Sequence, residues 1–413
     1  MSLKITNATL PDRKGNWNIA IANGYITEIT TAECNSSEAD ETLDARGKLL
    51  IPGLVDAHIH LDKALLLDRY PAVEGTFTEA LQKTLQAKQE YTVADIQTRA
   101  RKIIEKAIAF GTTAMRTHVE VDPILRLKSL EALLPLKQEY AWGIDLQLAI
   151  FAQEGITNQP GTVDLLNKAM AMGGDIIGSA PYVDPDPEEN IRTVFDIAQE
   201  FDCDVDFHLD FLDDDAPLLL PIVIQETLKR GWRDRVCLGH MTKLAGLTPA
   251  ELTGFIPELK EAGIAILALP ATDLYMMARQ DTHNVRRGVA PIHRLAKSGV
   301  KVGLATNNVQ NLFTPFGDGD VLKICTLLAQ VLQLGTTASH QLCLAMATTK
   351  AAEAIGIKNY GLEVGKIADL VLLEADSVSM AIATAPAKRI SIKRGKIVAQ
   401  TEFSTNFLGN IRF

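Results

Sequence analysis

The chain contains 413 residues, of which 47% are hydrophobic and 22% are charged. This composition supplies a sizeable core and excludes an intrinsically disordered chain. The formal net charge of −10 argues against a nucleic-acid-binding protein or a protein that binds anionic membranes, because no basic excess is available. Five widely spaced cysteines without a CxxC pair predict reduced thiols rather than a disulfide framework.

Several targeting and binding patterns are missing from the sequence. No apolar run reaches the roughly 18 residues of a transmembrane helix. The first residues, MSLKITNATL, lack the basic region and apolar stretch of a signal peptide. Neither GxxxxGK[ST] nor GxGxxG occurs, so a nucleotide phosphate loop is not supported. We therefore expect a cytoplasmic protein with neither nucleic acid nor a membrane as its partner.

The two ends of the chain share a pattern that the middle lacks. Short β-like stretches separated by glycine-containing turns occupy residues 1–50 and again residues 361–400. Each end is too small for an independent β domain, so we predict that together they form one small β-sandwich. The predicted domains are the sandwich, 1–52 with 360–413, and the segment inserted between its halves, 53–359.

The middle of the chain alternates apolar strands with amphipathic helices such as residues 93–111. Eight β-then-α units predict an α/β fold of the (β/α)8 TIM-barrel type, with a doubly wound open sheet as the alternative. The predicted strands are 53–61, 113–121, 145–153, 175–183, 204–210, 235–241, 265–271 and 301–307.

Five of the eight histidines fall on predicted strands near the barrel end where chemistry gathers. His58 and His60 are two residues apart in the first strand and therefore face the same side. His208 and His240 end the fifth and sixth strands, and His118 lies on the second. Neutral imidazoles from His58, His60 and His208, with one oxygen ligand, suit a divalent transition metal that activates water. The alternative for the HxH pair alone is a satisfied pair of core polar groups.

Longer motifs identify a family resemblance. IPGLVDAHIHLDK, FHLD, GHMT and GLEVGKIADLVLL resemble the amidohydrolase superfamily. RTHVEVD, IDLQLAIFAQEG, RRGVAPIHRLAKSG and NLFTPFGDGD resemble its cytosine deaminase branch, which includes N-isopropylammelide amidohydrolase. The resemblance covers nearly the whole chain. It implies a hydrolase with one Fe or Zn ion, and assembly as a homo-oligomer.

The resemblance also assigns the metal site. His58, His60 and His208 match three metal ligands, and the fourth, a strand-8 aspartate in the family, is Asn307 here. The predicted fourth strand contains no lysine, so the bridging carbamylated lysine of binuclear relatives is absent. His240 matches the histidine that polarises the water or the substrate. We therefore expect a mononuclear site with His240 and Asn307 as catalytic residues.

Substrate-binding residues follow from the same motifs. Gln153 in FAQEG matches the glutamine that hydrogen-bonds the heterocycle, and its amide can both donate and accept in one plane. Lys63 matches N-isopropylammelide amidohydrolase and could bind a ring oxygen or an anion, or be solvated. Phe313 and Phe316 could wall a planar ring or pack the loop after strand 8. Phe211 occupies the position of a proton-shuttling glutamate of cytosine deaminase, which puts cytosine itself in doubt.

Asn307 is the deeper departure from the family pattern. An amide can offer an oxygen ligand, but it brings no negative charge and cannot act as a base near neutral pH. An altered mechanism, a natural protein with little hydrolase activity and an engineered substitution are the competing explanations. Asp213, Asp214 and Asp215 form an acidic run that is typical of a solvated loop, and Asp273 could reach the barrel mouth.

Three functions remain open on this evidence. The first is a metal-dependent hydrolase that cleaves a C–N bond of a small N-heterocycle and releases ammonia or an alkylamine. The second is an impaired protein that keeps the fold and binds a heterocycle without turnover, as Asn307 and Phe211 suggest. The third, hydrolysis of a cyclic amide, is weakened by the missing strand-4 lysine.

Overall fold

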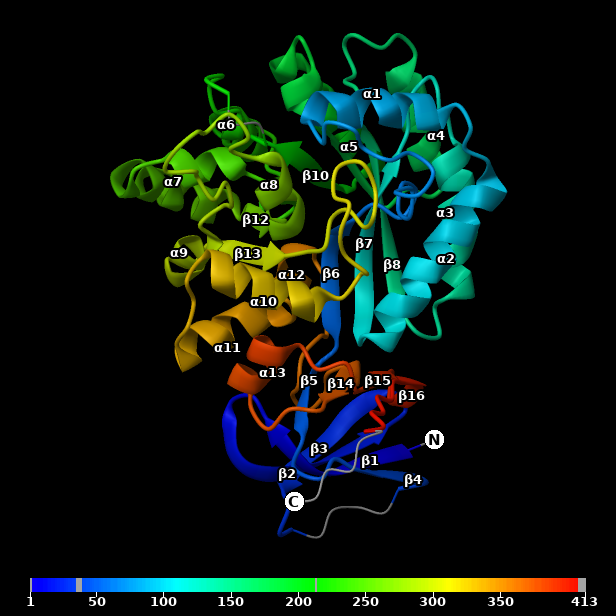
Figure 1. The fold of residues 1–413 in the computed structure, drawn as a ribbon, viewed down its shortest axis with the longest axis vertical. Coiled ribbons are helices and arrows are strands. Elements are labelled where there is room, and N and C mark those ends of the chain that lie inside the picture. Colours follow the sequence, from blue (N-terminus) through cyan, green and yellow to red (C-terminus); the bar gives the residue numbers. More distant parts are fainter. Residues whose placement is uncertain (1, 35–38, 212–213, 408–413) are drawn as a thin grey trace.

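The computed structural model describes residues 2–34, 39–211 and 214–407. Their strands form two sheets, one of eight parallel strands in sequential order and one that mixes strands from both ends of the chain. In Figure 1 the mixed sheet lies below the parallel sheet and its surrounding helices. The predicted combination of a TIM-type barrel with a β unit built from both chain ends is confirmed.

All eight predicted barrel strands are present; the strand predicted over 113–121 keeps its length and begins one residue earlier, and the other seven are shorter than predicted. Two of them end early because a proline starts a helical turn: Pro181 begins η1 (Pro181–Val183) and Pro270 begins α8 (Pro270–Met276). The strands are β6 (Leu54–Ile59), β7 (Thr112–Glu120), β8 (Asp145–Ala152), β9 (Ile176–Ser179), β10 (Asp204–Leu209), β11 (Val236–His240), β12 (Ala265–Ala268) and β13 (Lys301–Leu304).

The barrel closes through the segment that follows β13. Asn307 forms an isolated parallel bridge with Ile59, and its N–H donates to the His58 carbonyl at 2.8 Å. One residue earlier in the chain, Thr306 donates its N–H at 3.0 Å and its hydroxyl at 2.5 Å to the Asp56 carboxylate. Closure therefore brings the predicted strand-8 ligand to the strand that carries the HxH pair.

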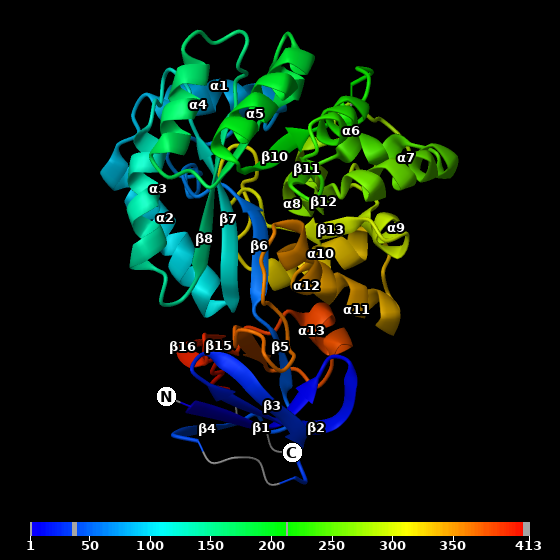
Figure 2. The ribbon, with the colours of Figure 1, turned by 180° about the vertical axis from the view of Figure 1, so that it is seen from behind.

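Amphipathic helices surround the barrel. In α2 (Val93–Ala109) the buried Ile96, Ala100, Ile103 and Ala107 recur every three or four residues, which places one apolar face on the strands. Figure 2 shows α2 and α3 (Lys128–Glu139) along the outside of β7 and β8. The other helices are α1 (Phe77–Lys88), α4 (Thr162–Ala171), α5 (Pro187–Phe201), α6 (Leu220–Lys229), η2 (Thr242–Gly246), α7 (Pro249–Ala262), α9 (Ile292–Lys297), α10 (Val321–Val331), α11 (Thr337–Met346), α12 (Thr349–Ala354) and α13 (Val378–Thr384).

The second sheet runs in the order β16-β15-β14-β5-β1-β2-β3, with β4 also paired to β1. It encloses its own apolar core, to which Ile5, Ile19 and Leu370 contribute. Its strands are β1 (Ser2–Leu10), β2 (Arg13–Ala22), β3 (Tyr25–Thr31), β4 (Glu41–Asp44), β5 (Leu49–Pro52), β14 (Leu370–Leu373), β15 (Arg389–Lys393) and β16 (Lys396–Gln400).

Buried ion pairs join this sheet to the barrel. Arg389 on β15 binds Asp320 through two hydrogen bonds of 2.7 and 2.8 Å. The Lys393 ammonium group donates to Asp145 at 2.6 Å, to Asp369 at 2.7 Å and to a backbone carbonyl at 2.9 Å. Such pairs fix the junction only while each buried charge keeps its partner.

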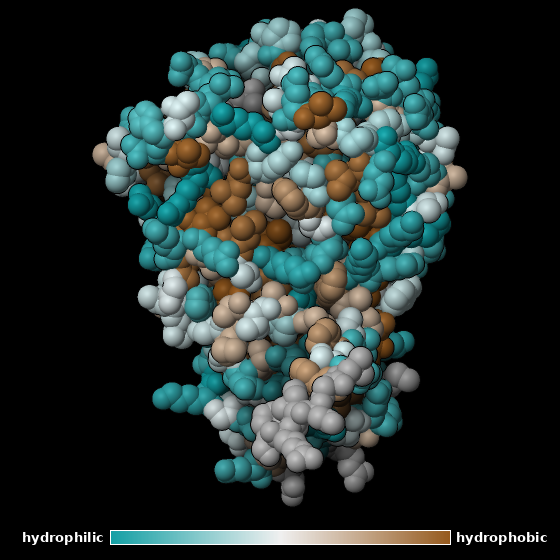
Figure 3. Space-filling view, viewed as in Figure 1, coloured by the Kyte–Doolittle hydropathy of each residue, from teal (hydrophilic) through white to brown (hydrophobic). Residues whose placement is uncertain are grey.

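The surface seen in Figure 3 is largely hydrophilic, and hydrophobic side chains gather in the middle of the barrel half of that face. Among the described residues, every helix is too short or too polar to cross a lipid bilayer.

Candidate metal centre and substrate pocket

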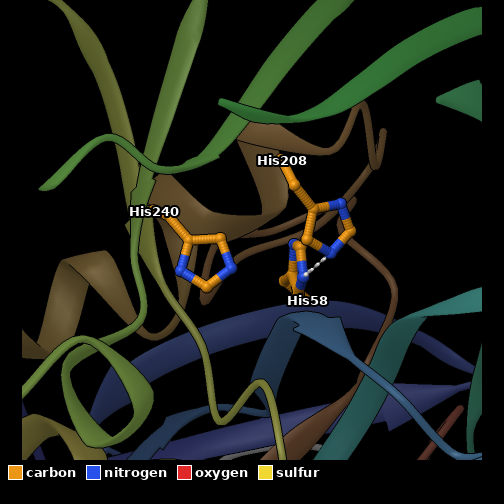
Figure 4. Close-up of side chains that lie close together, drawn as sticks. All are labelled: His58, His208 and His240. Atoms are coloured by element: carbon orange, nitrogen blue, oxygen red, sulfur yellow. Dashed lines mark hydrogen bonds between the residues drawn. The ribbon is translucent and has the colours of Figure 1, made fainter. Parts of the chain in front are cut away.

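Three imidazole rings converge at the mouth of the barrel. His208 Nε2 lies 3.1 Å from His58 Nε2 and 3.2 Å from His60 Nε2. Figure 4 shows the rings of His58 and His208 meeting, with His240 beside them. All three predicted ligands are buried, and burial holds the pKa of each imidazole well below its usual value. The rings are therefore neutral, which is the form that binds metals.

Asn307 completes the same region. Its side chain is fully buried, and neither amide atom has a hydrogen-bond partner among the described residues. Its φ of 61° lies in the left-handed region, which asparagine tolerates better than most residues. The Nε2 atoms of the three histidines lie too close together for each of them to carry a proton. Together with the unpartnered amide oxygen of Asn307, they fit the ligand set of a divalent cation.

His240 is oriented by a buried carboxylate. Its Nδ1 lies 2.8 Å from Asp273 Oδ1, and Asp273 Oδ2 accepts the backbone N–H of Leu269 at 3.1 Å. Burial raises the pKa of Asp273, while the hydrogen bond from His240 opposes that rise. His240 also has a φ of 71°, a conformation that concentrates at functional sites. The sequence placed Asp273 near the mouth but gave no signal for this contact.

A small pocket opens beside these histidines and gathers the predicted substrate-binding residues. Lys63 is buried rather than solvated, and its Nζ donates to Gln153 Oε1 at 3.1 Å. The ammonium group also lies 5.0 Å from the centre of the Phe313 ring, within cation–π range. The pocket is lined by His60, Lys63, Gln153, Tyr182, His208, Phe211, His240, Thr272, Asn308 and Phe313.

Aromatic side chains roof this pocket, and sequence reasoning missed two of them, Phe77 and Tyr182. The Phe77 ring, at the start of α1, lies 5.7 Å from Phe211 and 6.1 Å from Phe313, measured between ring centres. Phe211 in turn lies 4.1 Å from the ring of His240. Phe316, which the sequence paired with Phe313, is 62% exposed and is not among the residues that line the pocket.

The remaining candidates lie outside the pocket. Asp213 falls outside the described residues, whereas Asp214 and Asp215 are exposed, as expected of a solvated loop. His118 is buried inside the barrel, and its ring centre lies 3.7 Å from that of His58. It is therefore packed against a candidate ligand rather than facing the pocket.

The chain is similar to known proteins of one family. A model described as "Amidohydrolase family" matches residues 41–399. N-isopropylammelide isopropyl amidohydrolase of Pseudomonas sp. (strain ADP) is 31% identical over 97% of this chain and 98% of its own length. Pterin deaminase of Rhizobium rhizogenes is 28% identical over 92% of this chain and 87% of its own.

Two solved structures share the whole architecture. 5-methylcytosine deaminase from Klebsiella pneumoniae, liganded with 5-fluorocytosine, has a TM-score of 0.91 at 31% identity and covers 99% of both chains. N-isopropylammelide isopropylaminohydrolase from Burkholderia multivorans has a TM-score of 0.85 at 25% identity, over 97% of this chain and 98% of that one.

Proposed function

Because the chain belongs to the amidohydrolase family, we propose that it hydrolyses a C–N bond of a small N-heterocycle and releases ammonia or an alkylamine. The observation that carries the proposal is the meeting of three imidazole Nε2 atoms beside a pocket that also contains His240. Full-length relatives are named for an ammelide, a pterin and a methylcytosine. Because these relatives are named as amidohydrolases and deaminases, they favour hydrolysis over binding of a heterocycle without turnover.

We assign the metal to His58, His60, His208 and the amide oxygen of Asn307. A bound Zn or Fe ion supplies a Lewis acid that lowers the pKa of water towards neutrality. Asn307 is neutral and cannot take a proton near pH 7, so it contributes only as an oxygen ligand. Proton transfer therefore falls to another residue of the pocket.

His240 is suited to that transfer. With its Nδ1–H donated to Asp273, its Nε2 is left as the acceptor. His240 takes one proton from the attacking water and returns it to the departing amine as the exocyclic C–N bond to the ring carbon breaks. Asp273 fixes the tautomer and stabilises the imidazolium that forms between the two steps.

Four residues are proposed to hold the ring. Lys63 and the amide nitrogen of Gln153 offer hydrogen-bond donors, because the Gln153 oxygen already accepts from Lys63. Phe211 and Phe313 provide apolar faces that exclude water from a planar substrate. A ring with adjacent oxygen or nitrogen acceptors matches this arrangement.

The wider assignment is also a proposal. We place the reaction in residues 53–359 and the sandwich in 1–52 with 360–413. We expect a homo-oligomer from the resemblance to the branch, and a cytoplasmic protein from the five cysteines without a CxxC pair. The expected partner is a small heterocycle, and neither nucleic acid nor a membrane is expected. Light scattering on the purified protein measures the number of subunits.

An amine-release assay tests the reaction. The purified chain is incubated with cytosine, 5-methylcytosine, N-isopropylammelide and pterin, and ammonia or isopropylamine is quantified. The proposal expects turnover of at least one compound, and loss of that turnover in His58→Ala. Equal amine release by the unmodified chain and His58→Ala would contradict it.

A further inference from the structure

A second buried cluster lies beside the pocket and is not used by the reaction described above. It is centred on Lys88, the last residue of α1, whose side chain is fully buried. The Lys88 Nζ lies 2.5 Å from Glu120 Oε1, 2.8 Å from Asp122 Oδ2 and 2.5 Å from Glu154 Oε1. The three carboxylates belong to the RTHVEVD and FAQEG motifs.

One cation thus holds acidic groups from two strand ends. Glu120 ends β7, Asp122 follows it, and Glu154 lies in the loop after β8. Burial opposes the charge of Lys88, but Glu120, Glu154 and Asp122 together raise its pKa well above the usual value. Lys88 is therefore an ammonium ion, and without it the three buried carboxylates would repel one another.

The cluster is attached to both members of the Lys63–Gln153 pair. Glu154 follows Gln153 directly in the chain, so its contact with Lys88 restrains the backbone that presents the Gln153 amide. Asp62 precedes Lys63, and Asp62 Oδ2 accepts the backbone N–H of Glu120 at 2.9 Å. The two donors proposed to hold the ring are thus fixed through their immediate neighbours.

Lys88 also fixes the helix that carries part of the pocket roof. Phe77, the first residue of α1, packs against Phe211 and Phe313, whereas Lys88 anchors the other end of the helix. We propose that Lys88 is a positioning residue that orients Gln153 towards the heterocycle and keeps α1 over the pocket. This inference rests on the proposed function, because it concerns how the same site binds its ring.

The principal variant is Lys88→Met, and the chain offers a matched control. Lys393 is equally buried and also contacts three oxygen atoms, but it joins the second sheet to the barrel. Both Lys88→Met and Lys393→Met should lower the melting temperature. Only Lys88→Met should raise KM, by about tenfold, because the hydrogen bond from Gln153 to the substrate is then misplaced. In this variant kcat and metal content should stay within about threefold of those of the unmodified chain.

A double-mutant comparison tests whether Lys88 acts through Gln153. If it does, adding Lys88→Met to Gln153→Ala lowers kcat/KM by less than about twofold further. Glu154→Gln is the second variant, since it removes one of the three negative charges that hold Lys88 while Glu120 and Asp122 remain. It should show the same rise in KM if Lys88→Met fails to fold. The inference would be overturned if the loss of kcat/KM in the double mutant equalled the product of the two single-mutant losses. An unchanged KM in Glu154→Gln would also overturn it.

Amide hydrogen exchange separates this inference from the proposed function, because it needs no substrate. In Lys88→Met, amide exchange should accelerate at residues 153–155 and along α1, and Glu154→Gln should show the same change if it is used instead. In Lys393→Met, exchange at these residues should stay unchanged. Equal protection in the unmodified chain and the cluster variant would overturn the positioning role. Absence of turnover by the unmodified chain would instead overturn the proposed function.

Discussion

The Asn307 N–H donates to the His58 carbonyl at 2.8 Å, and this bond closes the barrel where the three imidazoles meet. The bond places an amide, rather than the carboxylate of the family pattern, among the proposed metal ligands. The barrel closure does not depend on the identity of this side chain, because it uses only the backbone of Asn307. Substitutions at this position therefore report on the metal and its chemistry.

Asn307→Asp should bind the metal more tightly. The new carboxylate adds a negative charge to a buried site that has none at that position. We expect loss of metal to a chelator such as EDTA to slow by at least about tenfold, in line with the effect of a nearby ligand change. Because the unmodified chain is proposed to use His240 as its base, kcat should change less than the metal affinity. A kcat that rises by orders of magnitude with Asn307→Asp would show that Asn307 disables the natural reaction.

His240→Ala should lower kcat by about 10²–10⁴-fold, the range contributed by a positioned general base. Metal content measured by elemental analysis should stay near that of the unmodified chain, because His240 is assigned to proton transfer. Loss of the metal in this variant would instead make His240 a ligand.

Asp273→Asn should lower kcat by about tenfold or more, because the amide no longer stabilises an imidazolium at His240. The pH dependence of kcat supplies the measurement. The limb that reports the base should move to lower pH in this variant, because an imidazolium without the neighbouring carboxylate gives up its proton more easily. An unchanged kcat and pH profile would show that the 2.8 Å contact has no part in the reaction.

Lys63→Met should raise KM more than it lowers kcat. The methionine keeps the apolar contact with Phe313 but removes the donor to the ring and to Gln153. A rise of about tenfold or more is expected, since hydrogen bonds to charged groups contribute about 1.5–3 kcal/mol. Steady-state kinetics checks this, with Lys137→Met as control, because Lys137 pairs with Asp175 away from the pocket.

Glu154 should make folding stability fall as pH rises. Burial raises its pKa to about 7, so the folded state holds a proton that the unfolded state releases near 4.5. That contribution is fully present below the unfolded pKa and is lost as pH rises through about 7. Between pH 5 and 8, the free energy of unfolding should fall further in the unmodified chain than in Glu154→Gln. The difference between the two proteins should be at most a few kcal/mol, because a shift of one pKa unit corresponds to about 1.4 kcal/mol. Parallel curves for the two proteins would contradict the raised pKa.

The barrel could be predicted because its strands are buried on both faces and are separated by amphipathic helices. Apolar runs such as 145–153 therefore mark the strands without knowledge of their partners. Their ends were less predictable, because Pro181 and Pro270 begin helical turns inside stretches that still read as apolar. Strand order in the second sheet depends on pairing between the two ends of the chain, which no local pattern encodes.

The histidines could be predicted as a group because each lies at a strand end, and parallel strands bring those ends together. Contacts between side chains that are distant in the chain could not be predicted from the sequence. Gln153 and Lys63 meet across 90 positions in the chain, and Asp273 on α8 reaches His240 across 33 positions. Phe77 and Lys88 carried no signal, since the path of α1 over the pocket is set by tertiary packing.

The central claim is that three histidines hold a metal which this chain uses in hydrolysis. Elemental analysis combined with amine release tests it most directly, on the unmodified chain, on His208→Ala and on His283→Ala, whose histidine is exposed on a loop. We predict one Zn or Fe ion per chain and turnover in the unmodified protein and in His283→Ala, with both lost in His208→Ala. Metal content and amine release that are the same in all three proteins would contradict the account.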